Sequence, residues 1–186
     1  STVNSQSAAP GHQHASELLR RQIFREVHEC FWKTDPRIKS TIESVKAPRV
    51  FIVPLFISNG YFTEEMIPRE LGIQDQKPTF PYRWKKGEQK FFYCAPIGTH
   101  ERMTEIVLAR AGEVVAKHPF PRAPKPGEIA LIIAGHGTTK NENSRKAIER
   151  QVESIRYMGI YAEVHAVFLE EEPRITDWYQ LSQERH

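Results

Sequence analysis

An internal repeat constrains this chain more than any single motif does. Residues 1–49 match residues 138–186 without a gap, each residue pairing with the one 137 positions later. The run Pro36-Arg37-Ile38, for example, pairs with Pro173-Arg174-Ile175. A gapless match through successive helix, strand and turn patterns predicts a duplication, so we expect the two copies to fold alike.

Each copy has the pattern of a helix, then a strand, then a turn. Apolar residues at i, i+4 and i+7 predict a helix over residues 144–157, and alternating ones predict a strand over residues 162–168. The repeat assigns a matching strand to residues 25–31. In the first copy, Pro10-Gly11 is expected to delay the start of the helix.

The middle of the chain continues the alternation of strands and helices. The apolar run 50–57 predicts a fully buried strand, residues 91–95 a further strand, and residues 103–114 a helix. Residues 73–90 are polar and are expected to form a surface excursion. Residues 118–127 contain four prolines and predict a semi-rigid linker. The predicted fold class is α/β with parallel sheets.

The repeat also predicts how the chain divides. We expect a first lobe over residues 1–117, a linker over residues 118–127 and a second lobe over residues 128–186. Ser1 pairs with Thr138, so the first copy lacks the strand that precedes Thr138 in the second. The second copy stops before its equivalent of the strand at residues 50–57. Both lobes are therefore expected to be incomplete, as in a middle segment of a longer protein.

Composition excludes several classes of protein. The chain is 39% hydrophobic and 26% charged, with a net charge of +3, which is ordinary for a soluble globular protein. No apolar run approaches the roughly 18 residues that span a membrane. Cys30 and Cys94 lie far apart, which favours a reducing, cytoplasmic compartment over a disulfide framework. The short basic patch Arg83-Trp84-Lys85-Lys86 does not favour nucleic-acid binding, and no phosphate-binding loop predicts a nucleotide.

The strongest site signal is a histidine that follows a predicted strand. The apolar run 129–134 leads directly into Gly135-His136-Gly137-Thr138. In parallel α/β sheets, ligands bind at the carboxyl ends of the strands. The two glycines would let the backbone approach a ligand and leave His136 little cover. From the residues alone, His136 either acts on a ligand or simply hydrogen-bonds the next loop.

Several motifs, taken in order, resemble those of one protein family. They resemble the class II chelatases, and most of all the CbiX-type sirohydrochlorin cobaltochelatases. The order of the motifs carries the resemblance more than any one of them. The matching residues are Gly135–Thr138, Asn141, Phe168-Leu-Glu170, Val53-Pro-Leu-Phe56 followed by Gly60-Tyr-Phe62, Ile67-Pro68 and Ala95-Pro-Ile-Gly-Thr-His100.

The resemblance implies a fold, a reaction and a set of site residues. It implies two Rossmann-like lobes that insert a divalent metal, cobalt or else nickel or iron, into a tetrapyrrole without a nucleotide. His136 would be a metal ligand and catalytic residue, and Glu170 the catalytic proton acceptor. The metal and the tetrapyrrole are substrates in this reaction. The remaining binding residues implied are Gly135, Gly137, Thr138 and Asn141.

The first lobe departs from the family pattern. Phe62 stands where the family has its second metal histidine, and Lys33 pairs with Glu170 in the repeat. These changes leave open a non-catalytic relative that binds metal or tetrapyrrole, or, further away, a redox or assembly factor. A second copy of the chain, or flanking segments of the same protein, would complete the lobes.

The other histidines are expected to have structural roles. His28 and His165 occupy equivalent places in the two copies, beside Glu26 and Glu163, which favours a repeated packing or hydrogen-bonding role. His100 is interpreted as structural. No role is expected for His12 and His14.

Overall fold

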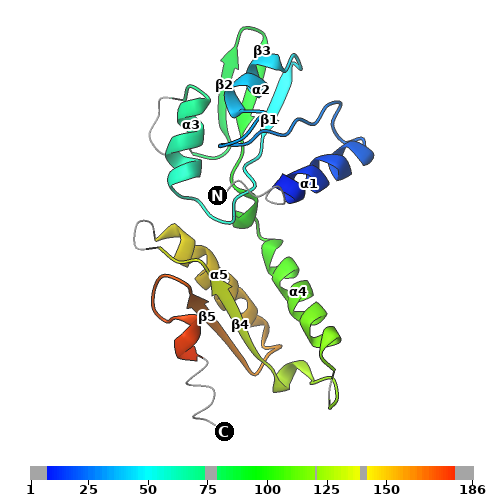
Figure 1. Cartoon of the computed structure of the whole chain (residues 1–186), viewed down its shortest axis with the longest axis vertical. Coiled ribbons are helices and arrows are strands. Elements are labelled where there is room, and N and C mark those ends of the chain that lie inside the picture. The colour runs from blue at the N-terminus through cyan, green and yellow to red at the C-terminus, as the bar shows by residue number, and fades with distance from the viewer. Residues whose placement is uncertain (1–7, 74–78, 120, 139–141, 179–186) are drawn as a thin grey trace. The chain divides into compact units, whose positions relative to one another are not determined.

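The computed structural model describes residues 8–73, 79–119, 121–138 and 142–178. By its contacts the chain divides into two compact units (Figure 1). The first unit contains Ser1–Leu55 and Phe62–Ala95, and the second contains Phe56–Tyr61 and Pro96–His186. Among the described residues, no helix is long and apolar enough to cross a membrane.

The first unit is built on a three-stranded mixed sheet in the order β1-β3-β2. Strand β1 runs parallel to β3, with Val50 opposite Phe91, and β2 runs antiparallel to β3, with Trp84 opposite Phe91. The elements of this unit are α1 (Ala9–Arg20), α2 (Ile38–Ser44), β1 (Arg49–Ile52), the π-helical turn η2 (Phe62–Met66), α3 (Ile67–Glu70), β2 (Tyr82–Lys86) and β3 (Gln89–Tyr93).

Strand β2 lies inside the segment 73–90 that was expected to be a surface excursion. That expectation was wrong for its second half, because Tyr82 and Trp84 pack against the core that Ile38 and Tyr93 help to form. The Trp84 ring stacks on Phe91, with 5.0 Å between the ring centroids. The alternation of large aromatic residues with Arg83 and Lys85 is the period-two pattern of a half-buried strand.

The predicted strand over residues 50–57 is shorter and more exposed than expected. Only Arg49–Ile52 pairs with β3, and Phe51 keeps 47% of its surface exposed while stacking on Phe92. Pro54 has no N–H to donate to a ladder, which explains why pairing does not continue through it. The prediction of a fully buried strand was therefore wrong.

The first helix begins next to its proline, and the segment after it differs from the prediction. Helix α1 begins at Ala9 and has Pro10 in its first turn, where the missing N–H costs nothing, which agrees with the late start predicted for Pro10-Gly11. Residues 25–31 form no strand; Phe31 makes only an isolated bridge with Arg37. A strand requires a partner, and the described part of this unit places none beside residues 26–30.

The second unit has a two-stranded parallel sheet covered by α5. Strands β4 and β5 pair along their whole lengths, and Gly135 lies opposite Phe168. The predicted helix over 144–157 and the strands on either side of it are confirmed to within about two residues. The elements are the 3₁₀ turns η3 (Ile97–Thr99) and η4 (Pro126–Glu128), α4 (Met103–Lys117), β4 (Ala130–Gly135), α5 (Asn143–Met158) and β5 (Glu163–Phe168).

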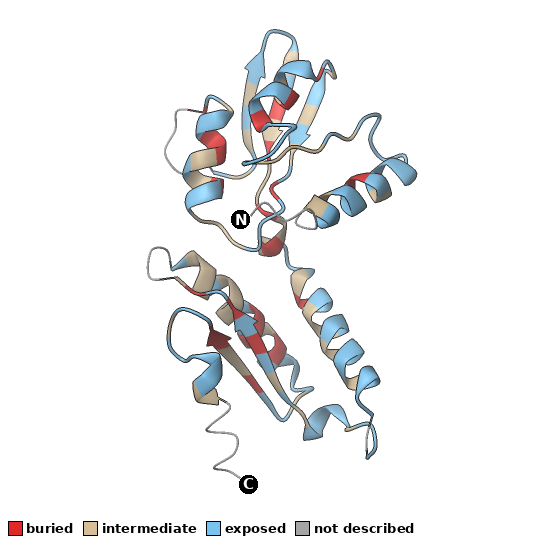
Figure 2. Ribbon diagram, viewed as in Figure 1, coloured by how far each residue is buried: buried red, intermediate tan, exposed pale blue. Residues whose placement is uncertain are grey.

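The core of the second unit lies between α5 and the two strands (Figure 2). Val152 and Ile155 on α5 are at most 3% exposed and pack on Ile133 of β4. Helix α4 joins this core through Val107 and Leu108. In addition, the Thr104 hydroxyl donates a 2.6 Å hydrogen bond to the side-chain oxygen of Gln151. Helix α4 therefore groups with the second unit, whereas the expected first lobe, residues 1–117, included it.

Local contacts recur at the spacing of the sequence repeat. The N–H of Phe31 donates to the Pro36 carbonyl at 2.9 Å, and the N–H of Phe168 donates to the Pro173 carbonyl at the same distance. The isolated bridge between Phe31 and Arg37 likewise has a counterpart between Phe168 and Arg174. The turn that closes each copy thus has the same hydrogen bonding in both units.

Candidate functional site

His136 and Glu170 lie together at the carboxyl end of the second unit's sheet. His136 follows β4 directly, and Glu170 comes two residues after the end of β5. Because β4 and β5 are parallel neighbours, the loops that follow them leave from the same edge. His136 Nε2 lies 3.3 Å from Glu170 Oε1, and both side chains are more than half exposed. The structure therefore brings together the two predicted catalytic residues.

Backbone hydrogen bonds hold the two loops against each other. The N–H groups of Leu169 and Glu170 both point at the carbonyl oxygen of His136, each at 3.1 Å. The Leu169 N–H is shared with the Gly135 carbonyl at 3.2 Å. These bonds fix the main chain on both sides of the pair, so only the side-chain torsions of His136 and Glu170 remain to be set.

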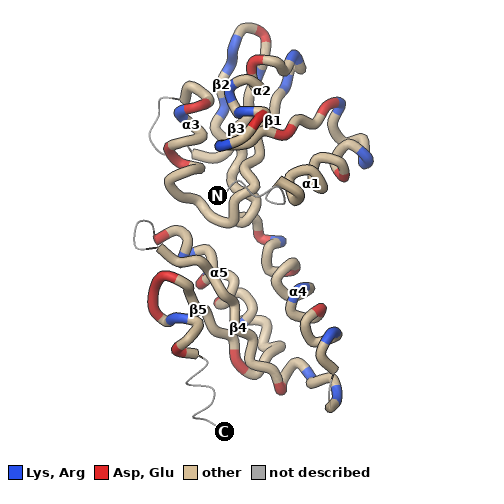
Figure 3. The backbone as a smooth tube through the Cα atoms, in the orientation of Figure 1, with Lys and Arg blue, Asp and Glu red and all other residues tan. Residues whose placement is uncertain are grey.

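Glu171 joins the two loops through its side chain. Its Oε1 accepts the Thr138 N–H at 3.0 Å, and its Oε2 accepts Nε of Arg145 at 3.1 Å. Figure 3 shows the acidic run after β5, to which Glu171 belongs. Sequence reasoning missed Glu171, because in a run of three glutamates nothing in a single sequence marks the one that turns inward.

Arg145, in the first turn of α5, connects several parts of this loop region. Its guanidinium lies 4.4 Å from the centre of the Phe168 ring. Its Nη1 donates to Glu149 Oε1 at 3.0 Å, and its Nη2 donates to the carbonyl of Glu172. The hydrogen bond to Glu149, with a smaller contribution from Glu171, raises the pKa of Arg145 above its ordinary value.

The glycines of the His136 loop are required by packing. A Cβ on Gly135 would lie 2.7 Å from Cγ1 of Ile148, and one on Gly137 would lie 2.7 Å from Cγ of Glu171. Gly137 also has φ +68°, a left-handed conformation that other residues adopt only at a cost. Both glycines are buried, so their close neighbours are the protein's own side chains. Asn141, which was also predicted to bind, lies outside the described residues.

Four other histidines have contacts within the protein. His165 Nε2 lies 2.8 Å from Glu163, and His28 Nε2 lies 3.2 Å from Glu26, which agrees with a repeated hydrogen-bonding role. The Arg102 N–H points at Nδ1 of His100 at 3.2 Å, near the start of α4, as expected for a structural residue. His12, for which no role was expected, has its Nδ1 2.5 Å from Glu29.

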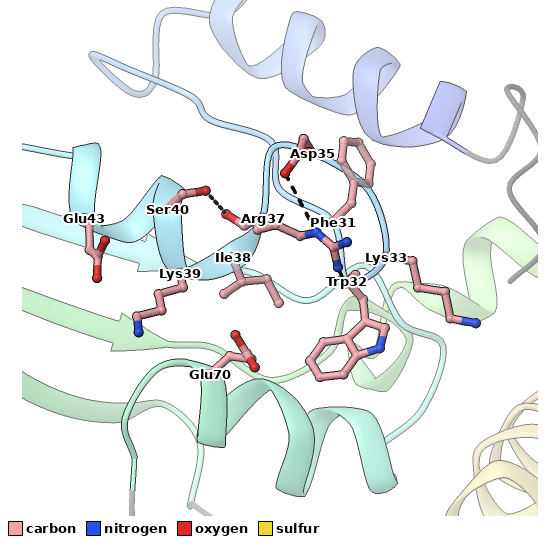
Figure 4. A pocket seen from close by; sticks show the side chains of 10 residues that line it. All are labelled: Phe31, Trp32, Lys33, Asp35, Arg37, Ile38, Lys39, Ser40, Glu43 and Glu70. Atoms are coloured by element: carbon pink, nitrogen blue, oxygen red, sulfur yellow. Dashed lines mark hydrogen bonds and ion pairs between the residues drawn. The ribbon is translucent and has the colours of Figure 1, made fainter.

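The equivalent region of the first unit carries different chemistry. Phe62 meets the Trp32 ring edge-on, with 6.0 Å between centroids, and Lys33 stands in the place of Glu170. Figure 4 shows the cavity there, of about 870 Å³, which Trp32, Lys33 and Arg37 help to line. Among the described residues, no histidine or cysteine lines it. In the described parts of both units, no three His, Cys, Asp or Glu side chains gather closely enough to hold a metal.

Comparisons with known proteins identify the class to which this fold belongs. A multi-domain protein of Deinococcus radiodurans, described as structurally similar to chelatases, superposes with a TM-score of 0.73 at 27% identity. The match covers 87% of this chain and 35% of that one. A CbiX described as the terminal enzyme of siroheme biosynthesis in denitrifying bacteria gives a TM-score of 0.61 at 19% identity, over 92% of this chain and 67% of that one. The fold is that of the class II chelatases.

The family follows from the sequence comparisons. The family model described as CbiX matches residues 2–114, which is more than half of the chain. A probable sirohydrochlorin cobaltochelatase of Halobacterium salinarum is 37% identical over 191 residues, covering 95% of this chain and 63% of that protein. This chain belongs to the CbiX family. It spans less than two thirds of the length of the Halobacterium relative.

Proposed function

We propose that this protein inserts a divalent metal into sirohydrochlorin or a related tetrapyrrole, with cobalt as the first candidate metal. His136 is the metal ligand and Glu170 is the proton acceptor. The observation that carries the proposal is the 3.3 Å approach of their side chains at the ends of two adjacent parallel strands. Family membership and the activity named for the Halobacterium relative support the choice of reaction.

The chemistry suits these two side chains. Neutral imidazole binds cobalt(II), nickel(II) and iron(II), and a carboxylate balances the charge of the cation. Insertion replaces the two pyrrole N–H protons of the macrocycle with one divalent ion. Glu170 lies close enough to His136 to accept these two protons in turn from a macrocycle that approaches the bound metal, and its exposed carboxylate passes each proton on to water. The tetrapyrrole nitrogens complete the coordination as the ion leaves the imidazole.

We further propose that the two units descend from one duplicated segment and that the second unit keeps the metal chemistry. The repeated hydrogen bond from Phe31 to Pro36 and from Phe168 to Pro173 supports the common origin. Lys33 has replaced the carboxylate in the first unit, and Phe62 cannot bind a metal.

An alternative is that the protein binds metal or tetrapyrrole without catalysing insertion. The observation that favours it is the pair of non-ligating residues in the first unit, Phe62 and Lys33. The described residues also place only two candidate donors, His136 and Glu170, at the site. A carrier would bind cobalt(II) and leave the absorption spectrum of added sirohydrochlorin unchanged.

Metal insertion into sirohydrochlorin, followed by absorbance, tests the proposal. We would compare the wild type with His136→Ala, using cobalt(II), nickel(II) and iron(II) in turn. His165→Ala is the matched control, because His165 also pairs with a glutamate but on the outside of β5. We expect His136→Ala alone to lose insertion. Equal rates for the wild type and His136→Ala would refute the mechanism, and metal binding without insertion would favour the carrier.

A further inference from the structure

We propose that Glu171, held by Arg145, is the positioning residue of the His136–Glu170 pair and sets its affinity for the metal. This inference rests on the proposed function of the same site. Glu171 does not contact the metal in this proposal. It acts through the main chain of the loop that carries His136.

The side chain of Glu171 turns inward, unlike those of its two neighbours. Glu170, Glu171 and Glu172 are consecutive, yet Glu171 is only 17% exposed, against 57% for Glu170 and 72% for Glu172. A carboxylate turned inward loses hydration, and hydrogen bonds must compensate for that loss. Glu171 makes them to Thr138 and Arg145, one with each oxygen.

The hydrogen bonds of Glu171 act on the loop that carries His136. The Thr138 N–H bound by Glu171 lies two residues after His136, and Gly137 between them has no room for a Cβ against Glu171. The His136 carbonyl is bound by the N–H groups that precede Glu171 in the chain. The His136 loop is thus fixed on both sides by the same three-residue segment, and Glu171 makes the side-chain contact.

Arg145 holds Glu171 through a set of contacts that the guanidinium makes at the same time. Its Nε binds Glu171, its Nη1 binds Glu149 and its Nη2 binds the Glu172 carbonyl, while its plane covers Phe168. The rigid, planar guanidinium holds donors on three separate nitrogens, whereas the donors of lysine all lie on one nitrogen. Arg145 therefore anchors the Glu171 carboxylate to both α5 and the end of β5.

The internal repeat separates this role from a role in folding the turn. In the first unit, Thr34 stands in the place of Glu171 and Ala8 in the place of Arg145. The turn nevertheless forms there with the same 2.9 Å backbone bond as in the second unit. The Glu171–Arg145 contact is thus not needed to make the turn. It occurs in the unit that keeps His136 and Glu170, and it is absent from the unit that has lost the carboxylate.

Cobalt(II) titration of the full chain, followed by visible absorption, tests the inference with the metal alone. Residues that orient a metal ligand typically change affinity by about 10–100-fold when they are removed, and we expect that loss for Glu171→Ala. Arg145→Lys keeps the charge but removes the fork, so it should weaken binding as well. Glu171→Gln keeps an acceptor for Thr138 and should recover part of the affinity.

Glu172→Ala is the matched control. It removes the same charge from the next residue, whose side chain is exposed. We expect it to bind cobalt(II) with the wild-type dissociation constant and absorption band. Glu171→Ala should instead shift the band, since the imidazole would no longer be held in one orientation. All titrations are made well below the thermal unfolding midpoint of each variant, so that loss of fold does not mimic loss of affinity.

The outcomes distinguish this inference from the proposed function. If His136→Ala loses cobalt(II) binding while Glu171→Ala binds as the wild type does, the positioning role is refuted and the site stands. If Glu171→Ala and Glu172→Ala weaken binding equally, the effect is one of net charge, and the positioning role is again refuted. If His136→Ala binds as tightly as the wild type, the site itself is wrong and this inference falls with it.

Discussion

The imidazole Nε2 of His136 lies 3.3 Å from Oε1 of Glu170, although helix α5 and strand β5 separate the two residues in the chain. Their neighbouring loops are joined by backbone hydrogen bonds from Leu169 and Glu170 to the His136 carbonyl. The pair is therefore a property of this edge of the sheet.

Glu170→Gln tests the proton acceptor of the proposed reaction. Glutamine keeps the size of the side chain but cannot accept a proton, so insertion should slow by about 10²-fold or more, the usual contribution of a general base. Initial rates of cobalt insertion, measured by absorbance, check this. The control is Glu163→Gln, which alters the equivalent partner of His165 outside the site. An unchanged rate for Glu170→Gln would exclude it as the base.

Gly137→Ala tests the packing of the His136 loop. The left-handed backbone conformation costs an alanine about 1–2 kcal/mol, and the contact with Glu171 adds to that cost. Gly159→Ala is matched in backbone conformation, with φ +63°, but has open space around its Cβ. We expect Gly137→Ala to lower the free energy of unfolding further than Gly159→Ala, as measured by urea denaturation. Equal losses would mean that the Glu171 contact relaxes freely.

Ile155→Ala tests where the core of the second unit lies. Ile155 has no exposed surface, so its truncation should lower the free energy of unfolding by about 2–5 kcal/mol. Leu18 occupies the equivalent place on α1 but is 36% exposed. Leu18→Ala should therefore cost clearly less in the same urea experiment. A larger loss for Leu18→Ala would show that α1 is packed as α5 is.

Tyr93→Phe tests how the stability of the first unit depends on pH in alkaline solution. Burial, with a smaller effect of Glu64, raises the pKa of Tyr93, whose hydroxyl donates to the Thr63 carbonyl at 2.7 Å. The neutral phenol is the form that the fold favours. Its contribution to the free energy of unfolding is therefore complete below the unfolded pKa of about 10 and is lost as the pH rises toward the folded pKa.

Tyr93→Phe removes this titration, so its free energy of unfolding should fall less steeply above about pH 10 than that of the wild type. At neutral pH the variant should be less stable by about 1 kcal/mol, for the lost hydrogen bond. Urea midpoints measured across this pH range check both effects. Parallel pH profiles for the two proteins would refute the assignment to Tyr93.

Sequence patterns predicted most of the second unit. The helix over residues 144–157, the strands on either side of it and the α/β class were confirmed, because each has a strong hydrophobic period and its partners lie close by in the chain. The proximity of His136 and Glu170 could also be predicted from the sequence, since two neighbouring parallel strands place the loops that follow them at one edge of the sheet. Their chemical roles remain predictions.

Only the tertiary structure decided which segments of the repeat adopt the same secondary structure in both copies. Residues 25–31 repeat the pattern of β5, yet only β5 forms a strand, because a strand depends on a partner and β4 supplies one. Helix α4 packs on the second unit through Thr104 and its apolar neighbours. Its own sequence pattern predicts a helix but does not predict the unit on which the helix packs. Within the acidic run, the inward turn of Glu171 depends on Arg145 and Thr138, which lie far from it in the chain. The sequence by itself determined the local patterns, the repeat and the family, whereas pairing and burial, which depend on distant residues, were decided by the fold.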